Sequence, residues 1–151
     1  MADSNSSVVL NHVLGRLNRS LLQYAVDCWP WSRATDTSEL ETPEQKSIEQ
    51  MTARQQEFVA RLVDLIMHEG GAVDLGTFDD HSELHYVGVD YLLGKLLADE
   101  QELVGELQSA LSALDSDVEA RTLVAEILAS EHENVARLGD LSRSASATVV
   151  A

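Results

Sequence analysis

The sequence predicts an all-α protein with the architecture of a four-helix bundle. Apolar residues recur every three or four positions along most of the chain, and no stretch alternates convincingly with a period of two. Only two prolines and eight glycines interrupt the 151 residues, so four long segments can remain helical. A chain of this length is typical of one domain and can bury a substantial core.

The first two helices are predicted from their apolar stripes and their end signals. The first spans residues 7–29, and Pro30 ends or kinks it. The second begins after Thr42, which suits the N-cap, with Pro43 at the first helical position. Gly70-Gly71 ends this second helix. The predicted stripe of the second helix consists of Ile48, Met51, Gln55, Phe58, Leu62 and Leu65.

The other two helices are predicted from their start signals. Each has a glutamate three residues after its first residue. The third is predicted over residues 80–113 and the fourth over residues 116–139. The bundle domain then covers residues 7–140. We expect residues 1–6 to be disordered and the tail of residues 141–151, rich in Ser and Ala, to be flexible.

The lengths of the links constrain the topology of the bundle. About two or three residues join the third and fourth helices, so these are predicted to be antiparallel neighbours. The link between the second and third helices, residues 70–80, spans roughly 36–40 Å when extended. A helix of about 27 residues is about 40 Å long. The link can therefore run the length of the bundle, which predicts a crossover and parallel second and third helices.

Composition excludes several classes of function. The formal net charge of −16 argues against binding to nucleic acid, whose phosphates select basic surfaces, and against anionic membranes. One cysteine cannot form an internal disulfide, and the sequence has no recognisable signal peptide or transmembrane segment. These features predict a cytoplasmic protein that binds neither nucleic acid nor membrane.

Two glutamates lie on stripes that are otherwise apolar. Glu100 falls on the stripe of the third helix and Glu131 on that of the fourth. Burying a carboxylate without a partner is costly. The pair therefore predicts a metal, a cation or a hydrogen-bond network inside the bundle.

Several fragments over about residues 10–138 share their order and spacing with a known family. In the first helix they are Leu10-Asn11-His12-Val13-Leu14-Gly15 and Gln23-Tyr24, and at the crossover His68-Glu69-Gly70 through Asp74-Leu75-Gly76. In the later helices they are Ala98-Asp99-Glu100-Gln101 and Glu126-Ile127-Leu128. Together these fragments resemble bacterioferritin, a member of the ferritin-like superfamily. The resemblance implies a ferritin-like bundle with a long crossover between helices 2 and 3, and a homo-oligomer, at least a dimer.

The resemblance also implies where metal ligands should lie, and this chain departs from that pattern. Ferritin-like di-iron sites take a Glu from each of two helices and a Glu-x-x-His from each of the other two. Leu17 replaces the first glutamate, and Gln55 stands where bacterioferritin has its haem ligand. The two motifs correspond to Arg54-Gln55-Gln56-Glu57 and Glu131-His132-Glu133-Asn134. The implied centre is a degenerate one with three carboxylates, Glu57, Glu100 and Glu131, and Arg54 among them.

Three functions are consistent with these residues. The first is a ferritin-like bundle without ferroxidase activity and without a cofactor, in a structural or binding role. Here Arg54 forms a buried ion pair with Glu57, Glu100 or Glu131, and Arg54→Ala is expected to destabilise the fold markedly. The second is an oxidoreductase or storage protein in which those three carboxylates hold iron or another divalent metal. The third is a cargo or adaptor protein.

Some further residues are candidates for binding. His81 and His85 have the spacing of metal ligands, whereas His132 points about 100° away from Glu131 around its helix. A protein partner could bind through Trp29-Pro30-Trp31 or through the C-terminal tail, residues 147–151. The alternative for the two tryptophans is that they cover one end of the bundle or fill a dimer contact.

Overall fold

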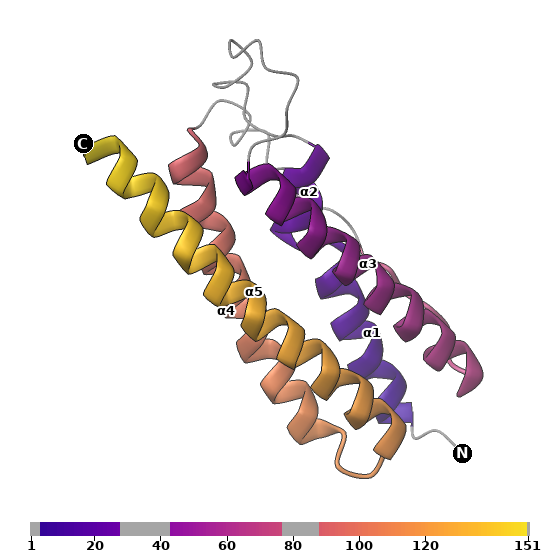
Figure 1. The fold of residues 1–151 in the computed structure, drawn as a ribbon. Coiled ribbons are helices and arrows are strands. Elements are labelled where there is room, and N and C mark those ends of the chain that lie inside the picture. The colour runs from indigo at the N-terminus through magenta and orange to yellow at the C-terminus, as the bar shows by residue number, and fades with distance from the viewer. Residues whose placement is uncertain (1–3, 28–42, 77–87, 151) are drawn as a thin grey trace.

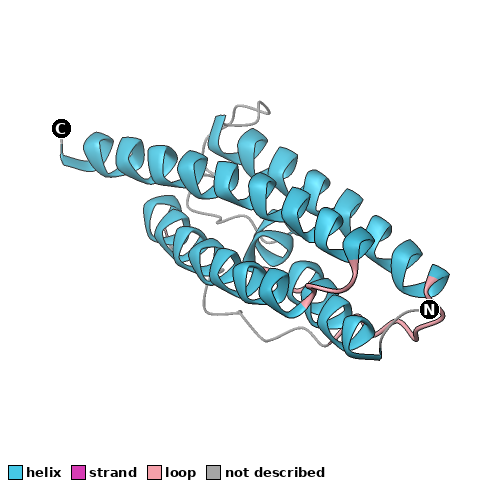
Figure 2. Ribbon diagram, turned by 90° about the horizontal axis from the view of Figure 1, so that it is seen from below, coloured by secondary structure: helices cyan, strands magenta, loops and turns pink. Residues whose placement is uncertain are grey.

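The computed structural model describes residues 4–27, 43–76 and 88–150. Helices joined by short turns make up nearly all of these ranges, which contain no strand, so the prediction of an all-α fold is confirmed (Figure 2). The helices are α1 (Ser4–Asn18), α2 (Leu21–Asp27), α3 (Pro43–His68), α4 (Val89–Ala113) and α5 (Val118–Val150) (Figure 1). No helix in the described part of the chain has a stretch long and apolar enough to span a membrane.

The predicted first helix is broken in two. It was expected to continue over residues 7–29, but α1 begins earlier, at Ser4, and ends at Asn18, and α2 begins at Leu21. The carbonyl of Ser20 accepts the first backbone hydrogen bonds of α2, and the N–H of Leu21 donates to the carboxylate of Asp99 at 2.9 Å. Asn and Ser favour helix ends over helix interiors, so the break falls where local propensity is weakest.

The last helix is longer than predicted. It does not stop at Gly139 but continues to Val150, so the tail expected to be flexible is largely helical. A single glycine inside a helix costs only about 1 kcal/mol. Leu138 is fully buried and Leu141 packs against the same apolar cluster, so apolar contacts extend across Gly139.

The directions of the helices follow from their contacts. Side chains of α3 meet those of α5 in reverse order: Ser47 with Arg137, Arg54 with Glu133, and Arg61 with Glu126. Thus α3 and α5 are antiparallel. A short turn makes α4 and α5 antiparallel as well, as predicted. It follows that α3 and α4 run in the same direction, as Figure 1 also shows.

The link after α3 turns back along α1. The Nδ2 atom of Asn11 donates to the carbonyl of Ala72 at 2.8 Å, and the amide of Asn18 donates to the carbonyl of Leu75 at 3.5 Å. The chain therefore moves from the end of α3 towards the other end of the bundle. The rest of the predicted crossover, residues 77–80, lies outside the described residues, as do Trp29, Trp31, His81 and His85. The third helix was predicted from residue 80, whereas α4 begins at Val89, after Gly88.

Two apolar clusters form the core, one in each half of the bundle. The first joins α1, α3, α4 and α5 and includes Leu14, Leu62, Leu103 and Val124. The second joins α2, α3, α4 and α5 and includes Leu22, Ile48, Leu93 and Leu138. The positions between the two clusters on three of the helices are occupied by Gln55, Glu100, Glu131 and Asn134, all of them buried. We call these four residues the polar layer.

Candidate functional site

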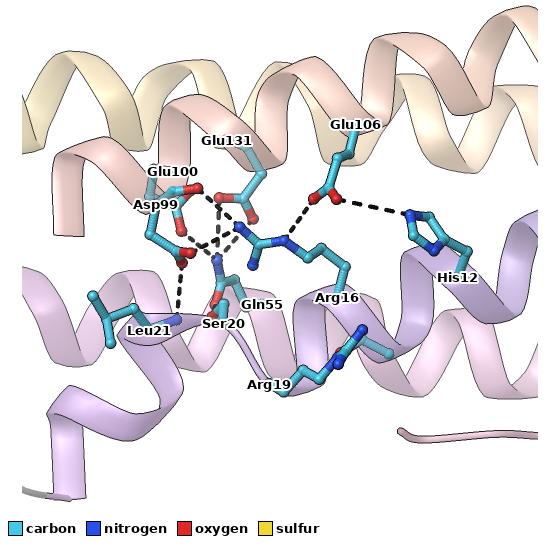
Figure 3. Close-up of polar contacts among 11 residues, drawn as sticks. His12, Arg16, Arg19, Ser20, Leu21, Gln55, Asp99, Glu100, Glu106 and Glu131 are labelled. Atoms are coloured by element: carbon cyan, nitrogen blue, oxygen red, sulfur yellow. Dashed lines mark hydrogen bonds and ion pairs between the residues drawn. The ribbon is translucent and has the colours of Figure 1, made fainter. Parts of the chain in front are cut away.

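Residues of three helices form the polar layer, and a residue at the break between α1 and α2 completes its hydrogen bonds. Gln55 comes from α3, Glu100 from α4, and Glu131 and Asn134 from α5. Ser20, at the break between α1 and α2, faces the same point (Figure 3). Gln55 is 1% exposed, and both glutamates are completely buried.

The side-chain amide of Gln55 is the centre of this network. Its Nε2 atom donates to Oε1 of Glu100 at 3.0 Å and to both carboxylate oxygens of Glu131 at 3.1 Å (Figure 3). Its Oε1 atom accepts from the Ser20 hydroxyl at 2.8 Å and from the Gln23 amide at 3.0 Å. Because donors hold the oxygen on one side, the amide nitrogen is directed at the two carboxyl groups.

Burial of two neighbouring carboxyl groups favours the protonated form of Glu100. Burial raises the pKa of the Glu100 carboxyl far above its usual range, and a hydrogen bond with Glu131 and the negative charges of Glu131 and Asp99 raise it further. The Oε2 atom of Glu100 is buried and receives no hydrogen bond from another group. That atom has room for the proton that the raised pKa favours. Glu131 also accepts from Nδ2 of Asn134 at 2.9 Å.

A second charged cluster adjoins the polar layer and holds α1 and the start of α2 against α4. Arg16 of α1 donates to Oδ1 of Asp99 at 2.8 Å and to Oε2 of Glu106 at 2.5 Å. The other carboxylate oxygen of Asp99 accepts the N–H of Leu21 (Figure 3). Asp99 therefore connects α1 and the start of α2 to α4. Because Glu100 is the next residue, this connection lies beside the polar layer.

The structure corrects the expected role of Arg54. It was predicted within salt-bridge distance of Glu57, Glu100 or Glu131, but its side chain is 53% exposed and pairs with Glu133 at 3.1 Å. Glu57 is exposed too. Successive residues are rotated by about 100° around a helix. With Gln55 directed inward, Arg54 lies on one side of it and Glu57 beyond the other.

The predicted three-carboxylate set is therefore not brought together, although Glu100 and Glu131 are. Within residues 4–27, 43–76 and 88–150, no group of three or more His, Cys, Asp or Glu side chains is arranged to hold a metal ion. His132 is exposed beside Glu131. Sequence reasoning missed Ser20 and Gln23 as partners of the layer. The position of Gln55 on the apolar stripe of α3 was the signal for its inward orientation.

Comparison with known proteins adds no assignment to this geometry. No protein-family model matches the chain, and no curated protein is significantly similar to it.

Proposed function

We propose that this protein is a ferritin-like bundle with a degenerate di-metal centre, in a structural or binding role without ferroxidase activity. The observation that carries the proposal is the amide of Gln55, which donates to both Glu100 and Glu131. A cation between these carboxylates would face the N–H donors of that amide. Turning the amide over would direct its nitrogen at the donors Ser20 and Gln23.

The topology supports the ferritin-like part of the proposal. Helices α3 and α4 run in the same direction, and the link after α3 starts back along α1. A long crossover between α3 and α4 completes this arrangement, as in the ferritin-like superfamily that residues 10–138 resemble.

The inward residues of the layer differ from the di-iron ligand set at the motif positions. With Gln55 inward, the second-helix motif corresponds to Gln55-x-x-Phe58, and the fourth-helix motif remains Glu131-x-x-Asn134. Neither contains the histidine that a Glu-x-x-His motif supplies. Gln55 supplies hydrogen-bond donors in a space where a di-iron site has two cations.

Metal analysis tests the proposal. Protein purified without chelator should contain iron, manganese and zinc well below one ion per chain, and it should oxidise added Fe(II) no faster than buffer. A variant with Gln55→Glu, Phe58→His and Asn134→His serves as the matched control, because it restores both motifs. Stoichiometric iron in the unaltered protein, located at Glu100 and Glu131 by anomalous scattering, would refute the proposal and favour iron oxidation or storage.

We also propose that the chain forms a homo-oligomer, at least a dimer, as the resemblance implies. A protein partner that binds Trp29 and Trp31 or the C-terminal tail belongs to the same proposal. Light scattering that finds only a 16.5 kDa particle at high micromolar concentration would contradict the oligomer.

A further inference from the structure

A pocket of about 270 Å³ lies between α3 and α5 and is lined by two arginines. Arg54 stands on the α3 side and Arg137 on the α5 side, with Glu133 as the acidic residue of the lining. The chain has only ten Lys and Arg residues and a formal net charge of −16. Two guanidinium groups and one carboxylate give this pocket a local charge of opposite sign to that of the whole protein.

Arg137 is held by Ser47 and forms no ion pair with a carboxylate of the described residues. Its Nε and one terminal nitrogen donate to the hydroxyl of Ser47 at 3.3 and 2.8 Å. Ser47 is buried and neutral, and no carboxylate among the described residues pairs with Arg137. An arginine has five N–H donors and stays charged at any physiological pH. Within residues 4–27, 43–76 and 88–150, the hydrogen bonds of Arg137 are to Ser47, so its other donors can face a ligand.

Arg54 is held by an ion pair that can open at low cost. Its partner Glu133 is 72% exposed, and the N–O distance is 3.1 Å. Exposed ion pairs of this kind contribute only about 0–1 kcal/mol to stability. An incoming anion can replace Glu133 without a large loss.

Hydrogen-bond donors surround the buried Glu131 carboxylate behind the pocket. Asn134 lines the pocket, and its Nδ2 atom donates to Glu131 at 2.9 Å. The Gln55 amide donates to the same carboxylate. These hydrogen bonds reduce the negative potential that the Glu131 carboxylate creates in the pocket. The polar layer therefore repels an anion less strongly.

We propose that this pocket binds a small oxyanion whose carboxylate or phosphate group bridges Arg54 and Arg137. Planar guanidinium groups bind both kinds of oxyanion through paired N–H···O bonds. The volume is just below the usual range for ligand pockets, which suits an anion of a few heavy atoms. The proposal goes beyond the role proposed above and is independent of whether the polar layer holds a metal.

Calorimetric titration of the full-length protein tests the site. The probes are inorganic phosphate and succinate, each measured against chloride at equal ionic strength, so that the stronger one identifies the oxyanion. We expect saturable binding that weakens by about tenfold or more in Arg54→Gln and in Arg137→Gln. Arg61→Gln is the matched control, because Arg61 forms a similarly exposed pair with Glu126 on the same two helices.

A variant with increased affinity provides a second test, because unfolding can weaken binding but cannot tighten it. Glu133→Gln removes the carboxylate that competes for Arg54 and should tighten binding roughly two- to fivefold, whereas Glu126→Gln should leave it unchanged. The proposal is wrong if neither probe shows saturable binding at millimolar concentration. It is equally wrong if Arg54→Gln and Arg61→Gln, both shown to be folded by circular dichroism, bind with the same affinity.

Discussion

The polar layer and the apolar clusters on either side of it solve the problem of burial in different ways. In the cluster around Leu62, contacts are non-directional, and any side chain of similar volume and shape can be accommodated. In the layer, Gln55 has to meet Glu100, Glu131 and Ser20 at hydrogen-bond distance. The apolar clusters therefore supply most of the stability. The layer restricts how α3, α4 and α5 can be aligned, because a shift of one residue would leave buried carboxyl groups without donors.

The largest effect should come from removing the central donor. Gln55→Leu fills the space but leaves Glu100 and Glu131 without the amide, and should cost about 3–5 kcal/mol at pH 8. Urea unfolding measures this cost. Because protonation relieves buried carboxyl groups, the cost should shrink at pH 5.

Leu62→Ala is the apolar counterpart of that change. It should cost roughly 2–5 kcal/mol through the cavity it creates, with the same value at pH 5 and pH 8. If the pH dependence of Gln55→Leu matched that of Leu62→Ala, the distinction between the two regions would fail.

The next effect should be a stabilisation. The folded pKa of Glu100 is raised, so the unfolded chain releases this proton at lower pH than the folded protein does. The contribution of Glu100 to the free energy of unfolding is therefore fully present below the pKa of the unfolded chain. It declines as the pH rises above that pKa. Glu100→Gln keeps the shape of the side chain and cannot ionise. It should raise the free energy of unfolding at pH 8 by about 1–3 kcal/mol and flatten its dependence on pH. An unchanged slope between pH 5 and pH 8 would show that Glu100 is ionised in the folded protein.

A smaller effect with the same sign is expected at the end of α3. Burial, followed by a hydrogen bond with Asp117 and its charge, raises the pKa of Glu69 to about 7. Stability should therefore fall between the ordinary carboxyl pKa and about pH 7 as Glu69 ionises. Because Glu69 is partly exposed, Glu69→Gln should gain no more than roughly 0.5 kcal/mol at pH 8. Titration of the side chain by NMR gives its pKa directly, and a midpoint near 4.5 would contradict the expectation.

The smallest effect should come from Arg54→Ala. The sequence favoured a marked loss of stability, because Arg54 was placed among buried carboxylates. Its exposed pair with Glu133 now predicts a change of about 1 kcal/mol or less. Chemical denaturation distinguishes the two outcomes, with Arg61→Ala as the control. A loss several times larger than that of the control would restore the original hypothesis.

The sequence revealed the parts of the fold that depend on local pattern. The bounds of α3 and the inward direction of Glu100 and Glu131 follow from helical periodicity and end signals. Arg54 was misplaced because the motif resemblance was given more weight than the stripe, on which Gln55 is the polar member. The contact between Asp99 and the Leu21 N–H joins residues far apart in the chain, so the preference of Asn18 and Ser20 for helix ends was not enough to predict the break before α2.

The break between α1 and α2 has a consequence for local unfolding. In the described part of the chain α2 has seven residues, fewer than an isolated helix needs to be stable. It depends on the second apolar cluster and on Asp99, and helical order cannot propagate into it from α1. We therefore expect α2 to open as a separate cooperative unit. Its amide hydrogens should exchange with solvent faster than those in the middle of α1.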